Sequence, residues 1–121
     1  MTAAGLRLLR DARTLVAEAW CNGAEARDSA GSMVSPWDDR AASWSLLGAI
    51  VAVLEREASF DRELSIPELA TALYALAKLV DCDSLIEWND RPRQTQGNVV
   101  AVLDRAAADY EETDTFFASL N

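Results

Sequence analysis

Apolar residues recur at spacings of three and four along most of the chain, which is the periodicity of a helix with one buried face. The pattern is clear over residues 3–20 and predicts a first helix there. Residues 24–35 follow as a polar connection that is longer than most links between helices. No segment shows the alternation typical of a strand. Met33 and Val34 could extend briefly, but nothing in the sequence offers them a pairing partner.

The second predicted helix begins at a strong local signal. Ser35 is suited to be its N-cap, Pro36 fits the first helical position, and Asp38 stands where a capping-box acid reaches back. The helix is predicted to run to about Glu57, and its apolar residues cover more than one face, which is typical of a central helix. Gly48 in its middle predicts a close approach by another helix, because glycine there costs about 1 kcal/mol relative to alanine.

Two further long helices are predicted in the second half of the chain. Ser65 and Glu68 form a capping box at the start of the third helix, which should end near residues 81–83. Residues 85–88 are predicted to add one short turn. Thr95 then follows a polar loop and is predicted to cap the fourth helix.

The chain ends in an apolar segment. Residues 113–121 are too apolar for a free tail and are predicted to dock as a short helix. The expected fold class is therefore all-α, a compact bundle of four main helices plus one or two short helices. A length of 121 residues is the usual size of one domain, so residues 1–121 are expected to form a single helical domain.

The balance of charge narrows the classes of function. The chain has 20 acidic and 11 basic residues, a net charge of −9, and residues 61–121 hold most of the excess. Direct nucleic-acid binding is not expected, because it needs a basic face. The sequence shows no signal-peptide pattern and no apolar run near the ~20 residues that cross a bilayer, which predicts a soluble cytoplasmic protein without membrane contact. Cys21 and Cys82 are predicted to be reduced thiols.

The residue types that are absent exclude several kinds of site. The chain has no histidine, so nucleophile–histidine pairs are excluded and a zinc site is hard to build. It has no glycine-rich phosphate-binding motif, and no cofactor is expected. Asp81 and Asp83 resemble the start of a calcium loop, but the central glycine and closing glutamate of an EF-hand are missing. We therefore propose no catalytic or metal-binding residue, and an enzyme is the least favoured class.

The best candidates for a binding site are polar residues beside two tryptophans. Trp20 and Trp44 lie on apolar stripes and are predicted to pack in the core. An amide, carboxylates and a guanidinium beside an indole can bind a small polar ligand or a protein backbone. The candidate ligand- or partner-binding residues are Trp37, Asp39, Trp88, Asn89, Asp90 and Arg91. In the alternative interpretation, Asn89 and Asp90 only fix their loop to neighbouring helices. This interpretation is favoured, because Asn and Asp so often serve in turns.

Three segments resemble the motifs of one protein family. Residues 20–23 match a W-[CQ]-x-G element, residues 42–49 match A-x-W-[CS]-L-x-G-A, and residues 88–90 open a W-N-D element. In this order they resemble a small bacterial and phage family of unknown function, over roughly residues 6–107. Ser45 stands where that family commonly has cysteine. The resemblance implies a helical single domain without an assigned activity, and it draws attention to the Trp-Asn-Asp loop.

Three functions stay open on the sequence. The leading hypothesis is a non-enzymatic protein-interaction or regulatory module with an unidentified protein partner, because no catalytic constellation is present and the chain is acidic. The first alternative is a small polar ligand-binding protein that uses the Trp-Asn-Asp loop. The second is an acidic phage-type inhibitor or nucleic-acid mimic, in which Asp104, Glu111 and Glu112 would form one outward face. A symmetric homodimer is also left open.

Overall fold

The computed structural model describes residues 3–59, 66–81 and 83–119. Within these ranges the chain forms helices α1 (Ala3–Glu18), α2 (Leu46–Ser59), α3 (Ile66–Leu79), α4 (Leu85–Asn89) and α5 (Gln96–Ser119), and strands β1 (Ala26–Arg27), β2 (Met33–Val34) and β3 (Ser43–Trp44). The protein is mostly helical, as the periodicity predicts, and it also contains a small sheet. None of the helices in the described ranges is both long and apolar enough to cross a bilayer.

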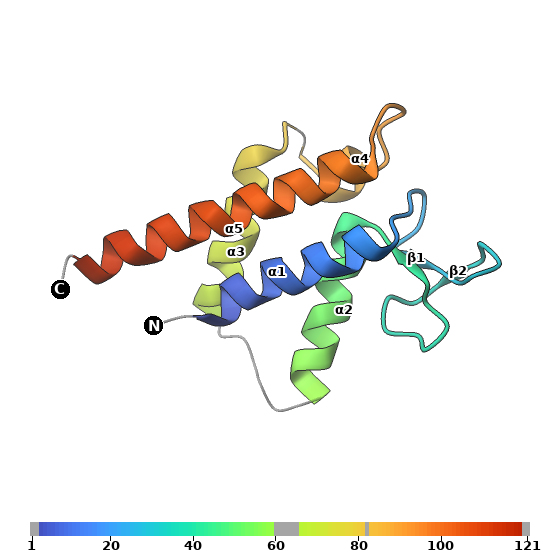
Figure 1. Ribbon diagram of the computed structural model, residues 1–121, viewed down its shortest axis with the longest axis horizontal. Helices are drawn as coiled ribbons and strands as arrows, with labels where there is room; N and C mark the ends of the chain where they lie inside the picture. Colours follow the sequence, from blue (N-terminus) through green and yellow to red (C-terminus); the bar gives the residue numbers. More distant parts are fainter. Residues whose placement is uncertain (1–2, 60–65, 82, 120–121) are drawn as a thin grey trace.

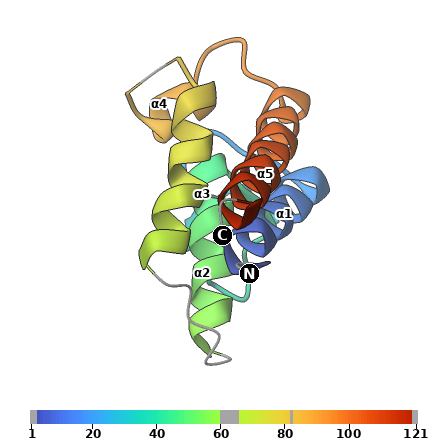
Figure 2. The same cartoon turned by 90° about the vertical axis from the view of Figure 1, so that its left-hand side faces the viewer.

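The helices form two layers. Helices α1 and α5 lie side by side and antiparallel, and α2 and α3 run across them (Figures 1 and 2). Apolar side chains of all four helices are fully buried between the layers, as predicted from the stripes; they include Leu9, Val16, Leu46, Ile50, Ala72, Leu76, Val99 and Leu103. The sheet lies at the opposite end of the molecule from the start of α1 and the end of α5 (Figure 1).

The expected all-α class is wrong in one respect, because residues 26–44 contain a three-stranded antiparallel sheet. The strand order is β2-β1-β3, and Ala26 in the central strand pairs with Val34 on one side and Trp44 on the other. Each strand has only two residues, too few for alternation to be visible in the sequence. The partner that the sequence does not reveal for β2 is therefore β1.

The start of α2 also differs from the prediction. The helix begins at Leu46 rather than Pro36. Ser45 caps it, because its Oγ accepts a hydrogen bond at 3.0 Å from the backbone N–H three residues on. Ser35 and Pro36 instead start a tight turn, in which the N–H of Asp38 donates to the Ser35 carbonyl at 3.0 Å. Proline favours the first position of a helix and the second position of a turn alike, so the local signal does not separate them.

Gly48 has the close neighbour that its position predicts, but the neighbour is a loop backbone and not a helix. A Cβ atom built on Gly48 would lie 1.8 Å from the carbonyl oxygen of Glu25. That carbonyl accepts a hydrogen bond of 3.0 Å from the N–H of Ser45. Glycine at this position therefore lets the first turn of α2 lie directly on the segment that leads into β1.

The C-terminal half follows the prediction more closely. Helix α4 supplies the predicted short turn, and Thr95 caps α5 by accepting a hydrogen bond from the N–H of Asn98 at 3.1 Å. Residues 113–119 continue α5 instead of forming a separate docking helix. The predicted cap Ser65 and the second cysteine, Cys82, lie outside the described residues.

Candidate functional site

The amide of Asn89 lies at the centre of a buried hydrogen-bond network. Its side chain is fully buried, with 0% of its surface exposed. Its Oδ1 accepts hydrogen bonds from the indole Nε1–H of Trp20 at 2.8 Å and from the backbone N–H of Leu46 at 3.0 Å. Its Nδ2 donates to the carbonyl of Cys21 at 3.2 Å and to Oδ1 of Asp90 at 3.0 Å. These four bonds use the whole capacity of the amide, two acceptor positions and two donors.

The two residues after Asn89 extend this network in different directions. Asp90 Oδ1 accepts a second hydrogen bond from the N–H of Gly23 at 3.0 Å. Arg91 turns toward Asp81, donating to its Oδ1 at 2.7 Å and to its carbonyl at 3.1 Å. This hydrogen-bonded ion pair lowers the pKa of the exposed Asp81 carboxyl. Arg91 therefore holds the loop to the segment after α3.

We name the residues joined by the first network the Asn89 junction: Trp20, Cys21, Gly23, Leu46, Asn89 and Asp90. One or more of them comes from each of the three segments that carry family-like motifs, 20–23, 42–49 and 88–90. The geometry explains why an indole N–H, an amide and a carboxylate occur together in these segments. Asn89 and Asp90 fix the end of α1, the start of α2 and α4 to one another.

The two tryptophans proposed as pocket walls have opposite environments. Trp88 is 9% exposed and packs in the core, and its carbonyl accepts a hydrogen bond from Gln94 Nε2 at 2.8 Å. Trp37 is 57% exposed and lies with Asp39 in the loop before β3. Trp37 and Asp39, but not Trp88, line a groove of about 380 Å³, which we name the Trp37 groove; its residues are Pro36, Trp37, Asp38, Asp39, Ala41, Trp44, Ala52, Glu55 and Arg56.

Two consecutive turns shape the loop that carries Trp37. The second turn is closed by a hydrogen bond of 3.0 Å from the N–H of Ala41 to the Asp38 carbonyl. The indole N–H of the buried Trp44 donates to the carbonyl of Pro36 at 3.2 Å and so holds the loop against the core. Pro36 is itself buried, which leaves the next side chain, that of Trp37, directed away from the core.

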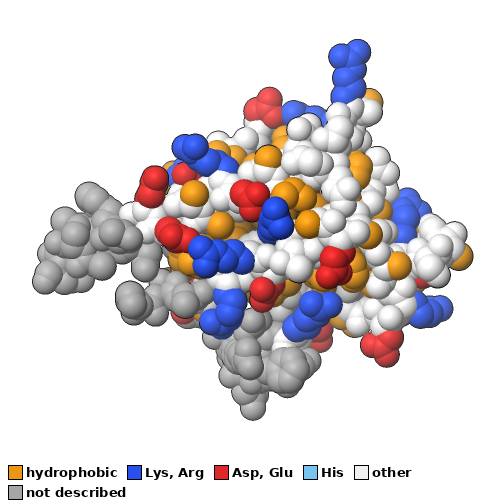
Figure 3. Space-filling view, viewed as in Figure 1, with side chains coloured by type: hydrophobic (Ala, Val, Ile, Leu, Met, Phe, Trp, Pro, Cys, Tyr) orange, Lys and Arg blue, Asp and Glu red, His pale blue; other side chains and the backbone are white. Residues whose placement is uncertain are grey.

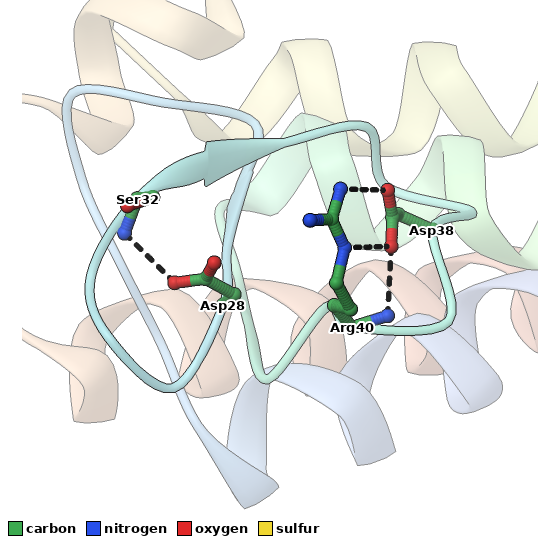
Figure 4. A network of polar contacts seen from close by, with 4 residues as sticks. All are labelled: Asp28, Ser32, Asp38 and Arg40. Carbon is green, nitrogen blue, oxygen red and sulfur yellow. Dashed lines mark hydrogen bonds and ion pairs between the residues drawn. The ribbon is translucent and has the colours of Figure 1, made fainter.

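Asp38 is neutralised within its own loop (Figure 4). Its Oδ1 accepts from the backbone N–H of Arg40 at 2.8 Å and from Nε of Arg40 at 3.1 Å, while Oδ2 accepts from Nη2 at 3.1 Å. The Arg40 side chain and backbone N–H together lower the pKa of the Asp38 carboxyl. No hydrogen bond or ion pair joins the neighbouring Asp39 to another residue in the part of the chain that the structure describes.

The hairpin between β1 and β2 is built by Asp28. Its Oδ1 accepts hydrogen bonds from the N–H groups of Ala30 at 3.0 Å and Ser32 at 2.9 Å, the second of which is drawn in Figure 4. Gly31 supplies the positive φ of 86° that the turn requires. The turn leads into Met33, the first residue of β2, which is 70% exposed. Met33 borders a second groove, which we name the Met33 groove: Ala24, Glu25, Met33, Val34, Ser35, Asp38 and Arg40, about 520 Å³.

A third and smaller groove lies beside the Asn89 junction. This Ile86 groove measures about 150 Å³ and is lined by Gly23, Ala24, Glu25, Ser45, Ile86, Asn89 and Asp90. The Met33 groove shares Asp38 with the Trp37 groove, and Ala24 and Glu25 with the Ile86 groove. The Met33 groove therefore adjoins each of the other two, and we name the three together the sheet-end surface.

The structure divides the six candidate residues between separate places. Asn89 and Asp90 lie together in the junction, and Trp37 and Asp39 lie together in the Trp37 groove. Trp88 and Arg91 line none of the three grooves. Sequence reasoning missed Met33 and Ile86, two of the most exposed large apolar side chains among the described residues. For Met33 a signal existed, since it is a large apolar residue directly after a run of turn-forming residues.

Two of the three acidic residues proposed for a nucleic-acid mimic, Asp104 and Glu111, lie beside arginines of α1, and no such contact is seen for Glu112 among the described residues. Asp104 accepts a hydrogen bond from Arg13 Nε at 3.0 Å, and Glu111 forms an ion pair with Arg10. Figure 3 shows basic and acidic side chains interspersed over the face formed by α1 and α5. This face has mixed charge rather than one continuous negative field.

One comparison with known proteins gives a match. A family model described as "Family of unknown function (DUF6197)" matches residues 2–109, a range that contains the whole Asn89 junction and all three grooves. No curated protein and no solved structure matches the chain.

Proposed function

We propose that this chain, which belongs to the family of unknown function DUF6197, is a non-enzymatic protein-interaction module that binds its partner through the sheet-end surface. One observation carries the proposal. Of the four large hydrophobic side chains that are strongly exposed in the described residues, Met33, Trp37 and Ile86 all border this surface. Exposed apolar residues gathered within a polar rim mark interaction sites, and tryptophan and methionine are enriched in protein interfaces.

The Asn89 junction favours this proposal over a small-ligand site at the Trp-Asn-Asp loop. Both donors and both acceptor positions of the Asn89 amide are already used inside the protein. A ligand would have to replace at least one of these bonds and would leave a buried partner unsatisfied. The adjoining groove of about 150 Å³ is also smaller than the ~300 Å³ at which ligand pockets usually start.

The ion pairs on α5 disfavour nucleic-acid mimicry in the same way. A mimic needs a row of carboxylates that a basic protein can neutralise. In this chain Arg13 already forms an ion pair with Asp104, and Arg10 forms one with Glu111. The exposed apolar residues of the sheet-end surface therefore favour a protein interaction over nucleic-acid mimicry by α5.

The test is a native pull-down from lysate of the source organism, read by mass spectrometry. The baits are the wild type, a variant with Met33→Thr, Trp37→Ser and Ile86→Gln, and a matched control with Tyr74→Ser. Tyr74, at 65% exposed, lies within the range of the three substituted residues, but it is on α3 and lines none of the three grooves. A protein retained by the wild type and by the control but lost by the triple variant supports the proposal.

Two results would contradict it. If all three baits retain the same proteins, the sheet-end surface is not the binding face. If none retains a protein above an empty matrix, the interaction function itself fails. Circular dichroism of each bait excludes loss of fold as the cause, and Asn89 is left unchanged because its side chain is buried.

A further inference from the structure

We propose that the Trp37 groove binds an arginine side chain that the partner protein presents. The inference rests on the proposed function and names the chemistry of the partner at one part of the sheet-end surface. Three features carry it: an exposed indole and a carboxylate without a partner in the described residues, both at the groove, and the acidic net charge of the whole chain.

The exposed indole is the first feature. The Trp44 indole N–H is held by the Pro36 carbonyl, and that of Trp20 is held by Asn89, so both rings are fixed inside the structure. Trp37 alone among the tryptophans of this protein has more than half of its surface exposed. The face of an indole attracts cations more strongly than that of any other side chain, and arginine is the cation found there most often.

The free carboxylate is the second feature. Asp38 and Asp39 are adjacent in the loop, yet only Asp38 is engaged, through three hydrogen bonds from Arg40. Asp39 is exposed at the groove and has no such partner among the described residues. The Asp38 carboxylate thus stabilises the loop itself. The Asp39 carboxylate, two residues after Trp37, is left to accept hydrogen bonds from an external donor.

The negative charge of Asp39 together with that of the whole chain is the third feature. The groove is bordered by the carboxylates of Asp38, Asp39 and Glu55 and by one guanidinium, that of Arg56. Because Arg40 neutralises Asp38 and Glu55 has a partner within the chain, Asp39 provides the attraction, while Arg56 opposes it from the α2 side. The net charge of the whole chain, −9, adds a long-range attraction for a basic partner.

These features favour a guanidinium over an ammonium. A guanidinium is planar, so it can stack on the Trp37 indole while its N–H groups point at a carboxylate. It forms two parallel hydrogen bonds with a carboxylate, which an ammonium cannot do. Its weaker hydration also makes it easier to bury against the apolar residues Pro36 and Trp44 that line the groove.

The experiment titrates ¹⁵N-labelled protein with the peptide N-acetyl-Gly-Arg-Gly-amide and follows the indole Nε1–H resonances. The comparison peptide carries citrulline, a neutral isostere of arginine. The Trp37 resonance is assigned from its loss in a Trp37→Phe variant. We expect a saturable shift of this resonance with a dissociation constant on the order of millimolar, at least about fivefold weaker for the citrulline peptide.

Two variants separate local from overall charge. Asp39→Asn removes the proposed carboxylate, and Asp11→Asn removes a carboxylate on α1 that is also exposed, so that both change the net charge by the same amount. We expect Asp39→Asn to weaken arginine-peptide binding about fivefold and Asp11→Asn to leave it within about 1.5-fold of the wild type.

The outcomes distinguish this inference from the proposed function. If the citrulline peptide binds as tightly as the arginine peptide, or if neither shifts the Trp37 resonance, the arginine inference is overturned even when the pull-down finds a partner. Equal weakening by both Asp variants also overturns it, because attraction would then depend on net charge alone. If the arginine peptide binds at Trp37 while the pull-down finds nothing, the groove chemistry stands and the interaction function fails.

Discussion

Single side chains in this protein hold together segments that are far apart in the sequence, and Asn89 is the clearest case. Its amide bonds Trp20, Cys21 and Leu46, which lie 69, 68 and 43 residues away. Truncation by Asn89→Ala would leave two buried N–H groups and a carbonyl without partners, at about 1–3 kcal/mol for each. We predict that this substitution lowers the free energy of unfolding by at least about 3 kcal/mol in urea denaturation.

The control for this prediction is Asn22→Ala, at an exposed position where only the backbone carbonyl is used as an acceptor, by Arg27. It should change the free energy of unfolding by less than about 0.5 kcal/mol. Equal unfolding midpoints for Asn89→Ala and the wild type would mean that the junction contributes little to stability. In that case the Trp-Asn-Asp loop would again be a candidate for direct ligand binding.

Two glycines in helices give a second prediction at the residue scale. Gly48→Ala places a methyl group against the Glu25 carbonyl, which belongs to the backbone and cannot rotate away. We predict a net loss of about 1–3 kcal/mol in unfolding free energy, in spite of alanine's better helix propensity. Gly97→Ala, in the first turn of α5, meets its nearest atom only at 3.9 Å and should be neutral or stabilising by up to about 1 kcal/mol. Thermal unfolding of the two variants measures both effects, and a stabilised Gly48→Ala would show that the backbone of Glu25 does not lie this close to α2.

At the scale of elements, the N-cap of α2 is not the residue that the sequence pattern predicts. Ser35 precedes proline and has the stronger sequence signature, whereas Ser45 makes the capping hydrogen bond. We predict that Ser45→Ala lowers the unfolding free energy by about 1 kcal/mol and that Ser35→Ala, at an exposed turn position, leaves it unchanged within about 0.5 kcal/mol. Chemical denaturation of both variants tests this, and the reverse order of effects would place the start of α2 at Pro36.

The elements that the sequence predicts well are those whose signal is local and repeated. The stripe over 3–20 and the cap at Thr95 each depend on residues within one or two turns, so α1 and the start of α5 could be predicted. The sheet could not, because two-residue strands depend on pairing with partners elsewhere in the chain. Trp44 looked helical for the same reason, since a large apolar residue before an apolar run fits either element.

The candidate site shows the same limit. The Trp-Asn-Asp segment stood out in the sequence, but its role depends on Trp20, Cys21 and Leu46, which no spacing rule connects to it. Trp37 and Asp39 were identified from their residue types, while their separation from Asn89 follows from the turns at 35–41. The sequence therefore indicates which polar and aromatic residues are suited to binding. The tertiary structure determines which of them lie close together.

On the scale of the whole molecule, stability and the proposed binding lie at different places. The buried core lies between the helix layers, and the exposed apolar residues Met33, Trp37 and Ile86 lie on the sheet-end surface. Exposed substitutions usually change stability by less than about 0.5 kcal/mol each. We therefore predict that the triple variant used in the pull-down keeps an unfolding free energy within about 1.5 kcal/mol of the wild type.

A single core substitution sets the scale for that comparison. Leu76→Ala, at a fully buried position in α3, should cost about 2–5 kcal/mol, more than the three surface substitutions together. Urea denaturation followed by circular dichroism compares the two proteins directly. If the triple variant loses as much stability as Leu76→Ala, the three side chains support the fold, and their exposure no longer argues for a partner. If it keeps the stability of the wild type, these three side chains do not stabilise the fold. Loss of a partner by the same variant in the pull-down then reports on binding alone.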